Sequence, residues 1–216
     1  METVQLPGAD GAVHDADLTI PPAAVGLVVF AHGSGSSRQS PRNRMVAGAL
    51  NDRHLATLLV DLLTIDEEAA ERRGARLRFD VDQLAVRLGA FTREIHRDPR
   101  LVNLPIGYFG ASTGAAAALV ATAIEPDGIA AIVSRGGRPD LAGSSLRVVQ
   151  APTLLLVGAR DEQILELNRQ AQTELAGPSE LIVVPGASHL FEEPGALEEV
   201  AQRAGDWLLA HGQGSG

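Results

Sequence analysis

A single serine stands between two glycines in the stretch GYFGASTGAAAALVATA, residues 107–123. Gly110, Ser112 and Gly114 fit the pattern G-x-S-x-G, after an apolar run typical of a strand and before an alanine-rich stretch typical of a helix. On such a turn the serine backbone is strained, and the glycines let strand and helix approach closely. The structural alternative for this hydroxyl is a cap of the following helix. We interpret Ser112 as a nucleophile raised above the carboxyl edge of a sheet.

A serine hydroxyl reacts at neutral pH only with help from a base, and an acid must orient that base. With a nucleophile of this kind, the acid and then the histidine follow along the chain. Asp161 ends the apolar run LLLVGARD, and His189 follows the last such run, in VPGASHLF. Like the serine, both come after predicted strands whose carboxyl ends share one edge of a parallel sheet. The sequence therefore predicts a catalytic triad of Ser112, Asp161 and His189.

Other residues compete for two of these roles. Asp161 could instead only cap the next helix, and Glu162 is the nearest alternative acid. Four histidines are poorly placed for a base, in an edge strand, at predicted helix ends or late in the chain: His14, His54, His96 and His211. His32 follows a strand but precedes the serine, so we interpret it as a hydrogen-bonded residue that braces the next loop.

The glycine-serine loop AHGSGSS, residues 31–37, follows another predicted buried strand. Acyl transfer passes through an oxyanion, which two preorganised backbone N–H groups can stabilise. We expect one N–H from Thr113, directly after the nucleophile, and the other from Ser34, with Gly35 as the next candidate. A loop of this composition is equally typical of a flexible turn.

Two arginines, Arg135 and Arg138, follow a predicted strand at the same edge, in VSRGGRPDL. A guanidinium can bind a substrate carboxylate through two parallel hydrogen bonds. Either arginine could equally pair with Asp140 or another acid and only fix its loop, and this structural role is the favoured interpretation. The candidate substrate contacts are Arg135 and three residues of the glycine-serine loop: His32, Gly33 and Gly35.

The composition excludes several classes of function. A formal net charge of −9 argues against a nucleic-acid or anionic-membrane surface. Without cysteine there are no disulfides, thiolate metal sites or cysteine nucleophiles, and without lysine there is no Schiff base or P-loop lysine. The arginine-rich stretch 71–78 is interpreted as a solvated face or a set of local ion pairs. No signal-peptide or membrane-span pattern is present, so we expect a cytoplasmic protein with no metal or cofactor.

Strands and helices alternate along the chain. Apolar runs typical of strands covered on both faces lie at 25–33, 56–63, 104–111, 128–136, 152–160 and 179–187, after weaker edge strands at about 2–6 and 13–20. Helical patterns lie at 40–54, 81–98, 112–124, 161–176 and 195–210. The pattern predicts an α/β fold with a mostly parallel sheet of about seven or eight strands and helices on both faces.

We expect one domain over residues 1–211 and a flexible tail over 212–216. Only 48 residues separate Ser112 from Asp161, and they must hold a helix, a strand and a short connection. That leaves no room for an inserted helical lid, so we expect an open site without a cap domain.

These motifs resemble the α/β-hydrolase superfamily and, within it, the small capless dienelactone hydrolase-like branch. The resemblance rests on VVFAHGSGSS, GYFGASTGAAAAL, LLLVGARDEQILELN and VPGASHLFEEPGAL. Two further stretches, ARLRFDVDQLA and VSRGGRPDL, point to a bacterial subgroup. Some members of that subgroup look like the hydrolase half of fusions with phosphoribosyltransferase-like domains.

The resemblance implies a carboxylesterase-type serine hydrolase that cleaves small soluble esters through an acyl-enzyme intermediate. It implies the same triad and the same oxyanion donors, Ser34 and Thr113. Dienelactone hydrolases proper use a cysteine nucleophile, which this chain lacks, so general ester hydrolysis is expected rather than activity on dienelactone itself. Alternatives are a lactone, thioester or activated phosphoester as substrate, or a non-catalytic ligand-binding protein of this fold. The expected partner is a small ester or lactone, with no nucleic acid or membrane, and the expected assembly is a monomer or homodimer.

Overall fold

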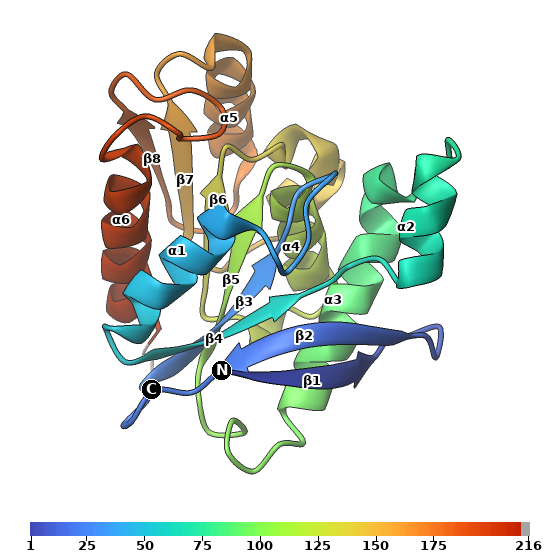
Figure 1. Ribbon diagram of the computed structural model, residues 1–216. Helices are drawn as coiled ribbons and strands as arrows, with labels where there is room; N and C mark the ends of the chain where they lie inside the picture. Colours follow the sequence, from blue (N-terminus) through green and yellow to red (C-terminus); the bar gives the residue numbers. More distant parts are fainter. Residues whose placement is uncertain (213–216) are drawn as a thin grey trace.

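A computed structural model describes residues 1–212 and shows one central sheet with helices on both faces (Figure 1). The eight strands are β1 (Glu2–Pro7), β2 (Val13–Thr19), β3 (Gly26–Ala31), β4 (Leu55–Val60), β5 (Ile106–Ala111), β6 (Ala131–Arg135), β7 (Thr153–Gly158) and β8 (Ser179–Val184). Their order in the sheet is β1-β2-β4-β3-β5-β6-β7-β8. β1 and β2 pair antiparallel, β2 pairs antiparallel with β4, and every later pairing is parallel. This confirms the predicted α/β fold and its mostly parallel sheet.

The helices are α1 (Pro41–Asn51), α2 (Ile65–Arg72), α3 (Val81–Ile95), α4 (Thr113–Ile124), α5 (Glu162–Glu174) and α6 (Ala196–His211). Short 3₁₀ segments are η1 (Leu77–Phe79), η2 (Pro126–Gly128) and η3 (Pro139–Arg147). One apolar cluster lies between the sheet and α3, α4 and part of α5, and a second lies between the sheet and α1 and α6. The central strands are therefore covered on both faces, as their unbroken apolar runs predict.

Local sequence signals account for where the helices begin. The Ser40 side chain accepts a hydrogen bond from the Asn43 backbone at the start of α1, whose first residue is Pro41. Asp80 caps α3 in the same way, and the apolar positions of α3 face the sheet. The alanines 115–118 of α4 are completely buried, so this helix packs close to the strands. That close packing positions the turn before α4.

One region differs from the sequence-based prediction. The connection from β4 to α3 folds into α2 and η1, whereas only an arginine-rich solvated face or local ion pairs were expected there. Part of that expectation holds, because Arg78 forms an ion pair with Glu71. α2 begins with a capping box between Thr64 and Glu67, which is a local sequence signal for the start of a helix. No cap domain is present among residues 1–212, and residues 213–216 of the expected tail lie outside the described residues.

Among residues 1–212, no helix combines the length and the apolar character needed to cross a bilayer.

Candidate active site

The turn between β5 and α4 places Ser112 at the carboxyl edge of the sheet. Its backbone has φ 51° and ψ −121°, a conformation that costs a residue with a side chain about 1–3 kcal/mol. The side chain makes no capping hydrogen bond to α4, although the residue stands at the cap position. The structural alternative, a helix cap, is therefore not realised. The strained turn instead presents a partly exposed hydroxyl at the edge of the sheet.

The two glycines around the serine are required by the space on this turn. A methyl group on Gly110 would lie 2.7 Å from the backbone nitrogen of Ala115, in the first turns of α4. A methyl group on Gly114 would lie 2.6 Å from the carbonyl oxygen of His32. Both distances are far inside van der Waals contact and involve backbone atoms that cannot rotate away. The G-x-S-x-G spacing thus lets α4 pack directly against the ends of β3 and β5.

Asp161 and His189 meet at the same edge, as the sequence predicts. Asp161 follows β7, and its carboxylate Oδ2 lies 2.5 Å from Nδ1 of His189, which stands on the loop after β8. Asp161 makes no capping hydrogen bond to α5, so its structural alternative is also not realised. In a neutral imidazole whose Nδ1–H donates a hydrogen bond to this carboxylate, Nε2 carries no proton. Nε2 is then the nitrogen able to act as a base.

Ser112 and His189 both lie next to the end of β6. The Ser112 N–H donates to the carbonyl oxygen of Arg135 at 3.3 Å. A methyl group on the next residue, Gly136, would lie 3.5 Å from Nδ1 and Cε1 of His189. Within residues 1–212 no hydrogen bond joins the Ser112 hydroxyl to His189. The acid is thus hydrogen-bonded directly to the base, and the nucleophile lies next to the same end of β6 as the base.

The two predicted oxyanion donors lie against each other. The backbone N–H of Ser34 donates to Oγ1 of Thr113 at 3.0 Å. The loop is shaped by a turn in which the Ser36 N–H donates to Gly33 at 3.1 Å, and Gly35 has φ +74° at its third position. The Ser34 N–H that was expected to face an oxyanion is therefore occupied by a hydroxyl of the residue after the nucleophile.

His32 braces this loop from inside. Its Nε2 accepts the N–H of Leu62 at 3.0 Å, so its Nδ1 carries the proton and donates to the carbonyl of Gly33 at 3.0 Å. Burial lowers the pKa of His32, which keeps the ring neutral. With both ring nitrogens bonded to backbone, His32 is not placed to contact a substrate as a base.

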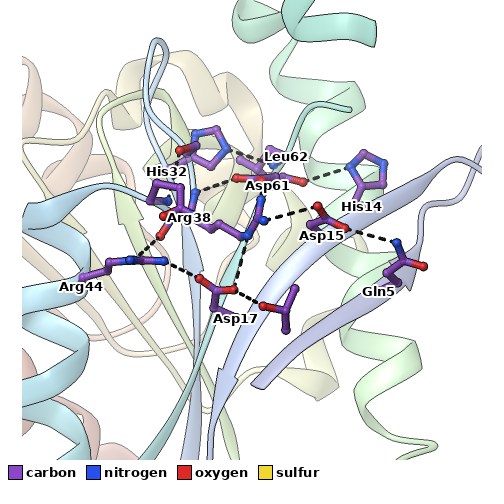
Figure 2. A network of polar contacts seen from close by, with 12 residues as sticks. Gln5, His14, Asp15, Asp17, His32, Arg38, Arg44, Asp61 and Leu62 are labelled. Carbon is purple, nitrogen blue, oxygen red and sulfur yellow. Dashed lines mark hydrogen bonds and ion pairs between the residues drawn. The ribbon is translucent and has the colours of Figure 1, made fainter. Parts of the chain in front are cut away.

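A network of charged residues ties the far end of the same loop to the sheet (Figure 2). The Arg38 backbone donates to Asp61 at 2.7 Å, and the Arg38 guanidinium also pairs with Asp61. The same guanidinium lies 3.4 Å from Asp15 and from Asp17 on β2. Arg44 of α1 donates to Asp17 at 2.7 Å. The antiparallel strand β2 is thus connected to the glycine-serine loop through Arg38.

A cleft of about 530 Å³ opens beside the two oxyanion candidates. Ser34 and Thr113 are among its lining residues, together with the first turn of α1. The opposite wall comes from the β4–α3 connection, with both apolar and charged side chains: Leu62, Leu63, Glu68, Glu71, Arg72 and Arg78. This wall was not predicted from the sequence, although the stretch ARLRFDVDQLA contributes Arg78 and Leu84 to the cleft.

The two arginines of VSRGGRPDL have different surroundings. Nε and Nη2 of Arg138 donate to the Asp140 carboxylate at 2.8 and 2.7 Å, the structural pairing that was favoured for both arginines. Arg135 is buried and has no ion pair or hydrogen bond through its guanidinium within residues 1–212. The same residues contain no group of three histidine, aspartate or glutamate side chains able to hold a metal ion.

A mostly parallel sheet with a serine on the turn after β5 and an Asp–His pair at the same edge defines an α/β-hydrolase fold. No family model matches the chain. The chain is 50% identical to a dienelactone hydrolase from Anabaena variabilis, over 98% of each chain, with a TM-score of 0.95. It therefore belongs to the dienelactone hydrolase-like branch of the α/β-hydrolase superfamily.

Two other relatives add to this comparison. An α/β serine hydrolase homologue from Coxiella burnetii shares the fold, with 19% identity, a TM-score of 0.77 and coverage of 95% of this chain and 96% of the other. A Mycobacterium tuberculosis protein, provisionally named a phosphoribosyl transferase, is 57% identical over 199 residues, which are 92% of this chain. The chain spans 44% of the length of that relative. The structural neighbours support a hydrolase of this fold.

Proposed function

We propose that the protein is a carboxylesterase-type serine hydrolase that cleaves small esters through an acyl-serine intermediate. The observation that carries the proposal is the 2.5 Å contact between His189 Nδ1 and Asp161, at the sheet edge where Ser112 stands on a strained turn. A positively charged imidazole is stabilised by such a carboxylate, so the ring can accept the proton of a nearby hydroxyl. The absence of a cap domain among residues 1–212 favours small, freely diffusing substrates.

The proposed reaction has two halves. In the first, Nε2 of His189 takes the Ser112 proton while Oγ attacks the ester carbonyl carbon. The tetrahedral oxyanion binds the N–H of Thr113 and shares the N–H of Ser34 with Oγ1 of Thr113. Collapse of this intermediate expels the alcohol oxygen, which takes the proton from Nε2. In the second half, His189 deprotonates a water that attacks the acyl-serine, and the returning proton restores the Ser112 hydroxyl. Nδ1 of His189 keeps its proton throughout and donates a hydrogen bond to the Asp161 carboxylate.

Lactones are the second candidate substrates, because a lactone is an internal ester that the same groups can open. The observation that favours them is the 50% identity to a protein named dienelactone hydrolase. This chain spans only 44% of the length of the mycobacterial relative. The name of that relative therefore assigns no transferase reaction to the part that matches this chain. A panel of short-chain nitrophenyl esters and small lactones would establish the preferred bond.

A covalent probe tests the nucleophile without knowledge of the substrate. A fluorophosphonate should label the folded wild-type protein at Ser112, and Ser112→Ala should abolish both labelling and ester hydrolysis. Ser36→Ala is the matched control, since it removes a hydroxyl from the cleft beside the oxyanion candidates and should keep both. Asp161→Asn should reduce kcat by roughly 10⁴-fold with the fold intact, because the wrong nitrogen of His189 would carry the proton. Full labelling of Ser112→Ala would show that another residue is the nucleophile.

A further inference from the structure

The segment RGGR, residues 135–138, begins at the last residue of β6 and lies between the proposed nucleophile and base; we call it the diglycine loop. The Ser112 N–H donates to the carbonyl oxygen of its first residue at 3.3 Å, and the Ser112 carbonyl accepts the N–H of its last residue at 3.1 Å. A Cβ on Gly136 would lie 3.5 Å from the His189 ring. The strained backbone of Ser112 and the space left for the imidazole therefore both depend on where this loop lies.

Two consecutive glycines give the loop little rigidity of its own, so contacts from outside must fix its position. Gly136 is held through its N–H, which donates to the carbonyl oxygen of Leu156 on β7 at 2.7 Å. Gly137 is held through its carbonyl oxygen, which accepts a hydrogen bond from Nδ2 of Asn168 on α5 at 3.0 Å. Among residues 1–212, no other side chain forms a hydrogen bond with either glycine. The amide of Asn168 is thus the side-chain anchor of the diglycine loop.

Asn168 is completely buried in the middle of α5, where an asparagine is unfavourable for the helix. Its Nδ2 also donates to the carbonyl oxygen of Ile164, one turn earlier, at 2.8 Å. This second bond sets the orientation of the amide, because a rotated amide would place its own oxygen against two carbonyl oxygens. Oδ1 is enclosed and accepts no hydrogen bond, which costs stability. The gain that offsets this cost is the contact with the diglycine loop.

The same helix carries the proposed acid at its start. Asp161 directly precedes α5 and binds His189 through its carboxylate. Asn168 lies seven positions later, about 10 Å along the helix axis. Because α5 packs against β7, β8 and η3, it forms a rigid connection between these two contacts. One contact orients the base, and the other fixes the loop that holds the backbone of Ser112.

We propose that Asn168 is a positioning residue, which anchors the diglycine loop and through it holds Ser112 in its strained conformation, aligned with the Asp161–His189 pair. This inference rests on the proposed hydrolase function. A strained backbone persists only where its surroundings enforce it. Without the amide, the Gly137 carbonyl loses its donor, the two glycines gain freedom, and Ser112 relaxes. The loss should therefore appear in the chemical step rather than in substrate binding.

The test measures kcat and KM for a short-chain nitrophenyl ester, together with the rate at which a fluorophosphonate labels Ser112, on wild type and on Asn168→Leu. Leucine has a similar size and removes both hydrogen bonds of the amide. Both kcat and the labelling rate should fall about 5- to 100-fold, which corresponds to roughly 1–3 kcal/mol for a buried carbonyl left without its donor. KM should change little.

Ala171→Gly is the matched control, because Ala171 lies one turn later on the same buried face of α5. It should lower the unfolding temperature by weakening the helix and leave kcat as in wild type. An unchanged kcat in Asn168→Leu, or an equal loss of kcat in Ala171→Gly, would overturn the proposal.

Asn168→Asp gives a readout that a loss of packing would not produce. An ionised aspartate turns an oxygen toward the Gly137 carbonyl, whereas a protonated one can donate a hydrogen bond to it. Burial against two carbonyl oxygens raises the pKa of such a carboxyl group. The ratio of its kcat to that of wild type should therefore rise as the pH falls from about 8 to about 5.5, while the ratio for Asn168→Leu stays constant. A ratio as low as that of Asn168→Leu at every pH would contradict the proposed anchor.

Hydrogen exchange separates this inference from the proposed function, because it needs no substrate. In Asn168→Leu the amides of Gly136 and Arg138, which donate to Leu156 and Ser112, should exchange faster than in wild type. In Ala171→Gly they should exchange at the wild-type rate. If the wild type hydrolysed no ester, the proposed function would fail, and the exchange result would still decide whether Asn168 anchors the loop. Unchanged exchange in Asn168→Leu would refute the inference whatever the esters show.

Discussion

The hydrogen bond between Thr113 and the glycine-serine loop leads to a quantitative prediction for Thr113→Val. Thr113 is 4% exposed, and its Oγ1 accepts the Ser34 N–H at 3.0 Å, across 79 positions of sequence. Valine keeps the shape of threonine and removes only the hydroxyl. A neutral hydrogen bond of this kind is worth about 0.5–1.5 kcal/mol. If it holds the loop in the reactive arrangement, its loss should appear in kcat.

The expected decrease in kcat is about two- to tenfold, because roughly 1.4 kcal/mol corresponds to a factor of ten. It should stay well short of the roughly 10²–10³-fold that removal of an oxyanion donor costs, since the Ser34 N–H is still present. Thr113→Ser keeps the hydroxyl and should retain most of the activity. The assay is kcat on a short-chain ester, with the unfolding temperature measured on the same samples.

Thr122→Val is the matched control for this experiment. Thr122 is on the same helix and fully buried, and its hydroxyl donates to Ala118 at 2.8 Å without touching the loop. The Thr122→Val substitution should lower the free energy of unfolding with no change in kcat. A faster Thr113→Val enzyme would mean that the hydroxyl competes with the oxyanion for the Ser34 N–H. An unchanged one would mean that the loop does not depend on it, and either result would refute the reasoning.

Three further predictions concern the support of the site. Gly114→Ala should destabilise the protein by about 3 kcal/mol or more and abolish hydrolysis, because the added carbon meets fixed backbone atoms of β3; wild-type-like melting would contradict this. Burial lowers the pKa of His14 and of His32, so the unfolded chain binds more protons below about pH 6.5. The free energy of unfolding should therefore fall from about pH 7.5 to about pH 5.5, and a flat profile by denaturant titration would exclude this coupling. Arg38→Gln should cost about 1.5–3 kcal/mol and raise hydrogen exchange in the glycine-serine loop, whereas Arg97→Gln, an exposed i,i+3 pair, should change neither.

Much of the site was predictable because local sequence fixes where each strand ends. The G-x-S-x-G turn, the aspartate after β7 and the histidine after β8 each follow an apolar run, and parallel strands bring their carboxyl ends to one edge. The order of the three residues along the chain then leaves few ways to assign their roles. The relation between Asp161 and His189 followed from this topology without any knowledge of their distance.

What could not be predicted depends on contacts between distant side chains. Arg135 and Arg138 are three positions apart in one motif, and only the folded chain shows that one is paired and the other is not. The engagement of the Ser34 N–H by Thr113 is likewise a contact between segments 79 positions apart. The cleft wall formed by α2 and η1 was missed because its residues are mostly polar, with only a weak apolar pattern to mark a helix.

The position of β6 between β5 and β7 fixes the size of the gap that the imidazole must bridge. Two strand spacings, about 9–10 Å, separate the backbone that carries the serine from the backbone that carries its acid. The imidazole enters this slot from the loop after β8 and passes residue 136, a glycine with φ +50°. A Cβ at that position would lie 3.2 Å from the carbonyl oxygen of His189 and 3.5 Å from its ring, so little space remains between them. The width of the sheet, together with chemistry, therefore limits which side chain can serve as the base at position 189.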